Sequence, residues 1–190
     1  AGLDAPIPAL AEDWEPRPRG WYATGVAFLP TGQLVVAGAR GSHVWALEFP
    51  EGRQASARMV AELDSGGGFT HVAIDRAGRT IALAGGDRVV RLFAPDGSAV
   101  AQLPSSGEVT ALALSPDGLT VVTGGNHGRL AIADRQSGKL VTEILAGQGR
   151  DLVDGAYPNT VLQIAFDPAG ERFASAYRDG HVRFYRRDGF

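Results

Sequence analysis

Hydrophobic and polar positions along the chain repeat one pattern four times, each copy centred on a glycine: Gly32, Gly78, Gly118 and Gly170. In every copy, large apolar residues stand four and six positions before the glycine, and an alanine separates them. The large residues are Val26 and Phe28, Val72 and Ile74, Leu112 and Leu114, and Ile164 and Phe166. The alanines are Ala27, Ala73, Ala113 and Ala165. This alternation predicts a strand with one bulky face and one small face before each turn.

Two more strands are predicted after each glycine. The second begins at an apolar position and ends small, at Gly38, Ala84, Gly124 and Ala176. The third is centred on Val44, Val90, Leu130 and Val182. Asp-Gly and Ser-Gly pairs separate the runs, which favours antiparallel hairpins. A fourth strand fits residues 100–103 and 140–144, between successive copies.

Units of four short antiparallel strands, with the anchor glycines 46, 40 and 52 residues apart, are typical of β-propeller blades. The segments VTALALSPDGLTVVTGG at 109–125 and VLQIAFDPAGERFASAYRDGHVRFYRR at 161–187 closely resemble WD repeats. The resemblance covers residues 22–190 and leaves residues 1–21 as an N-terminal arm. We therefore expect an all-β protein of four propeller blades.

The chain departs from the family in the hydrogen-bond network that often links a tryptophan, a histidine, a hydroxyl and a turn aspartate. The tryptophan position reads Leu47, Phe93, Ala133 and Tyr185, and the turn aspartate is kept only as Asp87 and Asp179. No copy retains the full set. Blade rigidity is therefore expected to depend more on packing.

The fourth copy reaches Phe190 without a fourth strand. The ring of propeller blades could be completed in three ways. Residues 5–14 of the arm, with prolines tolerable on an edge strand, could close a four-bladed ring. Alternatively, two copies pair as a homodimer into an eight-bladed ring, or an absent segment of a longer precursor completes it.

Composition narrows the partner classes. A net charge of −3 and an isoelectric point near 5.8 argue against nucleic acid as a partner. No apolar run approaches the roughly 20 residues of a membrane span, so a soluble protein is predicted, cytoplasmic or periplasmic. Arginine supplies 17 of 18 basic residues, which we interpret as a sign of a bacterial source.

Candidate chemistry is sparse. The chain has no cysteine and no G-x-S-x-G motif, and its four histidines lack the spacing of metal ligands. Asp151 and Asp154 match no calcium loop. They lie in an insertion, and insertions of this kind often carry binding. We predict no enzymatic activity, no cofactor and no metal.

The resemblance implies a rim where partners dock, formed by the loops that enter the first strand and those between the second and third. Carried over by position, it comprises Tyr22, Arg40, Phe69, His71, Arg88, His127, Tyr177 and Arg178. The leading hypothesis is a non-catalytic scaffold that presents this rim to a protein or peptide. The alternatives are an enzymatic propeller that holds a small molecule or metal in its rim loops, and a structural subunit of a larger complex.

Overall fold

The computed structural model describes residues 22–38, 41–48, 56–63, 69–146, 157 and 159–189, without the side chains of 69 and 70. Fifteen strands and two three-residue 3-10 turns are the regular elements in these ranges. The prediction of an all-β protein is confirmed. The arm of residues 1–21 lies outside the described residues, so its role in closing the ring stays a prediction.

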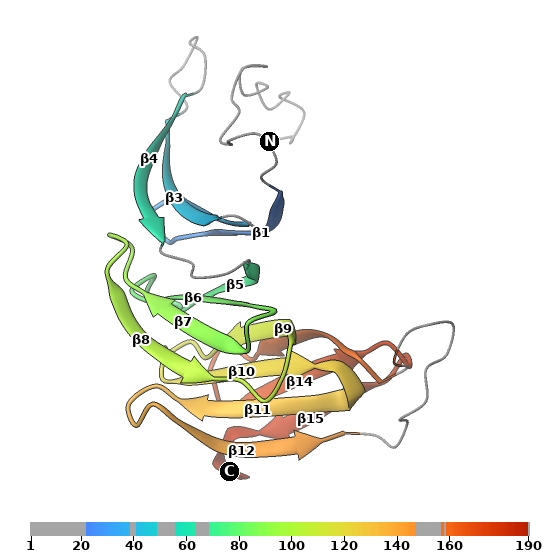
Figure 1. Ribbon diagram of the computed structural model, residues 1–190. Helices are drawn as coiled ribbons and strands as arrows, with labels where there is room; N and C mark the ends of the chain where they lie inside the picture. The colour runs from blue at the N-terminus through green and yellow to red at the C-terminus, as the bar shows by residue number, and fades with distance from the viewer. Residues whose placement is uncertain are drawn as a thin grey trace, which may run out of the picture.

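The strands form four antiparallel sheets in chain order, which we call blades 1 to 4 (Figure 1). Blade 1 consists of β1 (Ala23–Phe28), β2 (Leu34–Gly38), β3 (Gly41–Glu48) and β4 (Ser56–Leu63). Blade 2 consists of β5 (Phe69–Ile74), β6 (Ile81–Gly85), β7 (Val89–Phe93) and β8 (Ala99–Pro104). Blade 3 consists of β9 (Val109–Leu114), β10 (Thr120–Gly125), β11 (Arg129–Asp134) and β12 (Lys139–Leu145). Blade 4 consists of β13 (Val161–Phe166), β14 (Arg172–Tyr177) and β15 (Val182–Arg186).

These blades agree closely with the predicted strands. The fourth strands expected between copies are β8 and β12, each extended by a residue or two. Blade 1 also has a fourth strand, β4, which was not predicted from the sequence. Blade 4 has three strands in the described part of the chain, as the missing fourth segment of the last copy indicated.

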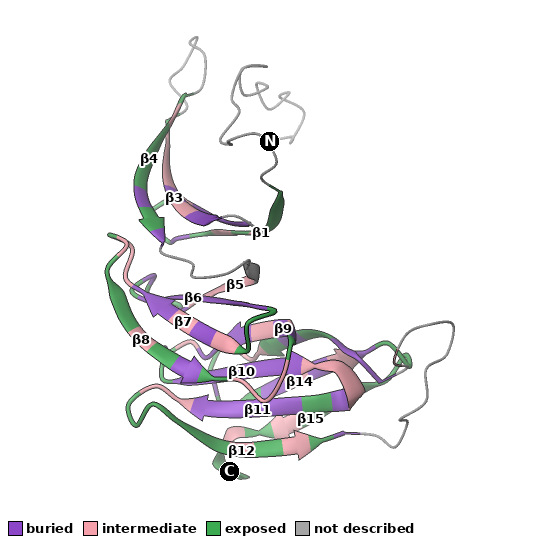
Figure 2. Ribbon diagram, in the orientation of Figure 1, coloured by how far each residue is buried: buried purple, intermediate pink, exposed green. Residues whose placement is uncertain are grey.

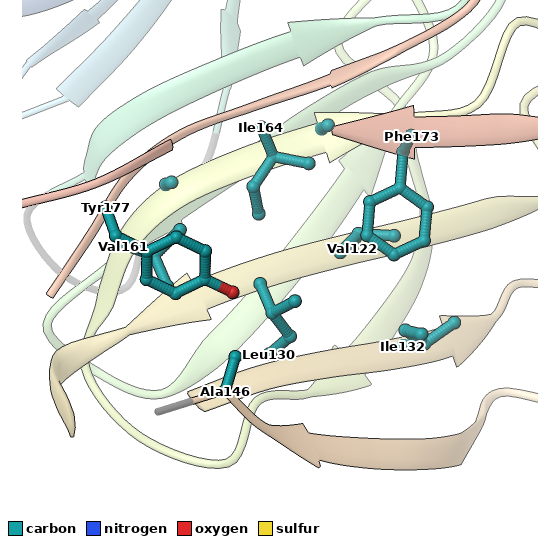
Figure 3. Close-up of a cluster of buried hydrophobic side chains, with 10 residues drawn as sticks. Val122, Leu130, Ile132, Ala146, Val161, Ile164, Phe173 and Tyr177 are labelled. Atoms are coloured by element: carbon teal, nitrogen blue, oxygen red, sulfur yellow. The ribbon is translucent and has the colours of Figure 1, made fainter. Parts of the chain in front are cut away.

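Successive blades stack through their first strands, which contact one another in the order β1, β5, β9 and β13. Each contact buries an apolar cluster, and the middle strands are the most deeply buried while β8 and β12 are largely exposed (Figure 2). In the cluster between blades 3 and 4, Leu130 and Ile132 lie opposite Ile164 and Phe173 (Figure 3). The core is therefore a series of layers between blades.

The small residue at or near the end of each second strand has a steric reason, clearest at Gly124. A Cβ atom there would lie 2.5 Å from Cγ1 of Val161, on the first strand of the next blade. The anchor glycines also make close approaches. All of them have positive φ, and a Cβ on Gly78 would lie 2.5 Å from the Cδ of Pro30 in blade 1. Gly32, in contrast, has nothing within 4 Å of the Cβ position.

Candidate functional site

The turns between the second and third strands of blades 2 and 3 carry two strained residues. Arg88 (φ 63°) precedes β7, and His127 (φ 62°) lies in the 3-10 turn Asn126–Gly128 between β10 and β11. In the register of the third strands, Arg88 stands where blades 3 and 4 have Gly128 and Gly180. The left-handed conformation costs a non-glycine residue about 1–2 kcal/mol. Such strain gathers at functional sites, so these turns are the leading candidates.

A cavity of about 340 Å³ opens between the two turns. It is lined by Arg88, residues 105–108 of the β8–β9 loop, residues 123–127, Arg129 and Tyr157. Three blades therefore surround it, because Tyr157 lies in the connection that leads to β13. The arrangement gives a pocket at the junction of blades rather than within one.

Hydroxyl groups line the inner wall of the cavity. The Oγ of Ser105 lies 3.3 Å from the Oγ1 of Thr123 and donates to the Gly107 carbonyl oxygen at 3.1 Å. The backbone N–H of Ser105 also donates to the carbonyl oxygen of Arg88 at 2.9 Å, which ties the β8–β9 loop to the strained turn. The wall is polar and fixed in place by these bonds.

An aromatic pair forms the opposite wall. The rings of His127 and Tyr157 have centroids 3.7 Å apart and planes inclined by 50°. Their position is held by Thr160, whose Oγ1 lies 3.2 Å from Oδ1 of Asn126 in a hydrogen bond. Gly128 must be glycine here, because a Cβ would lie 2.0 Å from the carbonyl oxygen of Ala146 and φ is +70°.

Two arginines line the cavity, and only one of them makes an ion pair with a described residue. Arg129 donates from Nη1 to Oε2 of Glu143 at 3.1 Å. The guanidinium of Arg88, on an exposed residue, makes no ion pair with any described residue. A strained, exposed arginine with all its side-chain donors available is suited to a carboxylate or phosphate ligand.

The structure brings together two of the eight predicted rim residues, Arg88 and His127, at one cavity. His71 lies on β5 beside blade 3 and does not line it; burial lowers its pKa, although a hydrogen bond with the backbone of Val109 acts in the opposite sense. Tyr22, just before β1, and Arg178, just after β14, are exposed and do not line the cavity. Arg40 and the side chain of Phe69 lie outside the described residues.

Tyr177 is 3% exposed and is therefore not part of a docking surface in this conformation. Its hydroxyl accepts from Ser175 Oγ at 3.0 Å and lies 3.1 Å from the hydroxyl of Tyr185, which stands at the tryptophan position. The guanidinium of Arg183 lies 4.2 Å from the ring centroid. Burial, with the bond to Tyr185, raises the pKa of Tyr177 above its usual range. Blade 4 thus has a polar network of its own, which the expectation that rigidity depends more on packing did not include.

The described residues contain no group of three histidine, aspartate or glutamate side chains that could hold a metal ion. Nor does any helix in those ranges have the length and apolarity needed to cross a membrane. Ser105, Thr123 and Tyr157 line the cavity and were missed as individual residues. A signal existed for Tyr157, since it lies in the insertion expected to carry binding.

Comparison with known proteins identifies the repeats. The family profile described as WD domain, G-beta repeat matches residues 97–134 and 153–186. The first match runs through β8 to the end of β11, and the second ends with β15. No curated protein matches the chain.

Proposed function

Since this chain is a WD-repeat protein, we propose that it acts as a non-catalytic interaction module whose rim cavity binds a peptide segment of a protein partner. The repeats support this role at the level of the family, whose members generally mediate protein–protein interaction. The cavity between blades 2 and 3 supplies a specific place for it. That the partner is a protein with such a peptide segment is itself part of the proposal.

The observation that carries the proposal is the conformation of Arg88. Glycine would relieve the left-handed turn, and blades 3 and 4 use glycine at this position. Arginine there costs stability and leaves an exposed guanidinium beside a polar cavity. A side chain that is costly to the fold and makes no ion pair with the residues that the structure describes is best explained by a ligand.

The lining indicates the chemistry of that ligand. Arg88 can form paired hydrogen bonds with a carboxylate, and the hydroxyl wall can accept or donate to a peptide backbone. The His127 and Tyr157 rings offer apolar area at little entropic cost. We therefore propose a short segment that presents an aspartate or glutamate next to an apolar side chain.

A displayed library of short peptides, selected on the whole chain, tests the proposal. Enriched peptides should carry an acidic residue, and their binding should fall at least about 10-fold in Arg88→Ala and in His127→Ala. Arg79→Ala, at the opposite end of blade 2 and also exposed, is the matched control. Binding that survives both rim substitutions would place the docking surface elsewhere.

Arg88→Gly separates binding from folding. This variant keeps the turn and removes the strain, so its free energy of unfolding should rise by about 1 kcal/mol while peptide binding is lost. A variant that is more stable and still binds would show that Arg88 has no functional role.

A second candidate, the role of structural subunit, is favoured by a separate observation. Both ends of the row of blades present apolar surface that nothing in the described part of the chain covers.

A further inference from the structure

Every interface between successive blades joins the same two unlike surfaces. We call the face that carries the large residues of the first strand the leading face, and the opposite face, with the alanine of that strand, the trailing face. Val72 and Ile74 of blade 2 pack on the cluster shared with blade 1, and Leu112 and Leu114 of blade 3 on the cluster shared with blade 2. The leading face of each blade thus meets the trailing face of the blade before it.

The inner strands of each trailing face carry small residues where these large residues pack. In the cluster between blades 2 and 3, Ala73, Ala82 and Ala84 belong to the trailing face of blade 2. Between blades 3 and 4, Ala111 and Ala113 serve the same purpose. The large residues of the first strand and these alanines make the inner parts of the two surfaces complementary, while larger residues such as Leu92 and Leu130 extend the trailing face on the third strand.

Among the described residues, no blade stands in front of the leading face of blade 1. Val26 and Phe28 are 64% and 65% exposed, whereas their counterparts in the other blades are packed. The register continues this surface across the sheet, since Phe28 pairs with Leu34, Leu34 with Trp45 and Trp45 with Met59. The open space beside Gly32 marks the same absence of a neighbour.

At the other end of the row, no blade in the described part of the chain stands behind the trailing face of blade 4. Ala165 pairs with Ala174 and Ala174 with Phe184, while Ala176 pairs with Val182. Phe184 and Val182 are 79% and 55% exposed. The inner part of this face is small, as in the trailing faces that are covered. Its third strand carries Val182 and Phe184, and the pair of Arg172 and Arg186 lies at the end of the face nearest the anchor turn.

The two uncovered faces are therefore the two halves of the interface that the chain already makes three times. They lie at opposite ends of the row of blades, and β1 and β13 share no contact as extensive as those between neighbouring first strands in the described residues (Figure 1). A chain with unlike, complementary ends joins head to tail, and such contacts give a closed ring when the rotation closes.

We infer that the leading face of blade 1 binds the trailing face of blade 4 of a second copy of this chain, so that two copies close one ring of eight blades. The ring contains two identical new interfaces, related by a twofold axis. Eight blades lie within the range known for propellers. Both large apolar faces are buried by this arrangement, which removes an aggregation hazard. The inference is independent of the proposed peptide cavity, which lies between blades 2 and 3.

The mass of the native chain in solution is the first test. At micromolar concentration the expected particle has twice the 19.9 kDa mass of the chain, with no ladder of larger species. A monomer at that concentration overturns the inference, because the chain would then close on itself or leave its ends uncovered. A ladder of oligomers overturns the closed ring.

Two charge substitutions identify the faces. Phe28→Asp and Phe184→Asp should each raise the dissociation constant of the dimer at least about 30-fold, because each places a carboxylate in both interfaces. Both residues are exposed in the monomer, so far-ultraviolet circular dichroism should be unchanged. Val141→Asp, on the exposed outer strand β12, is the control and should leave the dimer intact.

Mixing the two variants distinguishes head-to-tail joining from like-to-like joining. Each variant keeps the face that the other has lost, so the mixture should form a mixed dimer through one intact interface while each variant alone is monomeric. If Phe184→Asp alone remains a full dimer while Phe28→Asp does not, two leading faces pair with each other and the inferred ring is wrong.

Discussion

The interface between blades 3 and 4 and the outer surfaces of blades 1 and 4 are built from the same kinds of residue, yet only the first is closed. Phe173 in the closed interface is 2% exposed and stacks on Tyr185, with ring centroids 4.9 Å apart. Phe184, on the adjacent strand of the same blade and facing the other side, is 79% exposed. The difference shows that a blade becomes a layer of core only when a neighbour covers each face.

The largest predicted difference in stability is the one between truncation of Phe173 and truncation of Phe184. Phe173→Ala should lower the free energy of unfolding by about 3–5 kcal/mol, because it leaves a cavity in a closed cluster. Phe184→Ala should change it by less than about 0.5 kcal/mol at concentrations where the chain is monomeric. Urea denaturation followed by circular dichroism measures both. Equal losses would mean that Phe184 is covered in the monomer.

The anchor glycines give a second, smaller contrast. Gly78→Ala and Gly32→Ala share the cost of a left-handed alanine, about 1–2 kcal/mol. Gly78→Ala should cost about 1–3 kcal/mol more, because its Cβ collides with Pro30 while that of Gly32 meets nothing. Thermal denaturation of the two variants under one set of conditions gives the difference, and identical losses would contradict the close packing of blade 2 on blade 1.

The polar network of blade 4 should have a moderate effect. Tyr177→Phe removes a hydroxyl that serves both Ser175 and Tyr185, so unfolding should become easier by about 1–2 kcal/mol. Tyr22→Phe, on an exposed residue of blade 1, is the matched control and should have no measurable effect. A neutral Tyr177→Phe would show that packing alone holds the blade.

The smallest expected effect comes from the ion pair that joins blade 4 to blade 3 on the side of the anchor turns. Arg187 Nη1 lies 2.6 Å from Oδ2 of Asp117. Burial acts to raise the pKa of Asp117, but hydrogen bonds from Ser115, the Leu119 N–H and Arg187 outweigh it and lower the pKa from 3.8 to about 2. Because both groups are substantially exposed, the pair should contribute less than about 1 kcal/mol.

This contribution has a defined dependence on pH. A carboxyl whose folded pKa is lowered stabilises the fold above its unfolded value of 3.8 and loses that effect as the pH falls through about 2. The difference in urea midpoint between wild type and Asp117→Asn should therefore be constant near neutral pH and shrink between pH 4 and pH 2. A difference that grows on acidification would contradict the assignment.

Much of the fold could be predicted from the sequence because the repeat constrains it at several positions at once. Alternation around Gly118 and Gly170 fixed strands and faces together, and the small strand end at Gly124 anticipated the close approach of Val161. The strand β4 escaped prediction because its residues, SARMVAEL, alternate poorly. The alternation of apolar and polar residues is a weak signal for a strand that is exposed at the outer edge of its blade.

The candidate site was only partly predictable. Arg88 and His127 were named because their turns lie on the rim, but their left-handed conformations depend on tertiary packing. Tyr177 was expected at the surface by position, but it is buried and contacts Arg183 and Tyr185 on the neighbouring strand β15. Contacts of this kind depend on the register of the paired strands. The position of a residue in the repeat does not specify that register.

The most direct test of the complementary end faces uses the absence of cysteine from the chain. A variant with both Phe28→Cys and Phe184→Cys carries one thiol on each uncovered face, and a short bis-maleimide can join only those thiols. The account predicts a covalent dimer with two cross-links, visible by mass after denaturation. A monomer linked within one chain, or a ladder of linked oligomers, would contradict it.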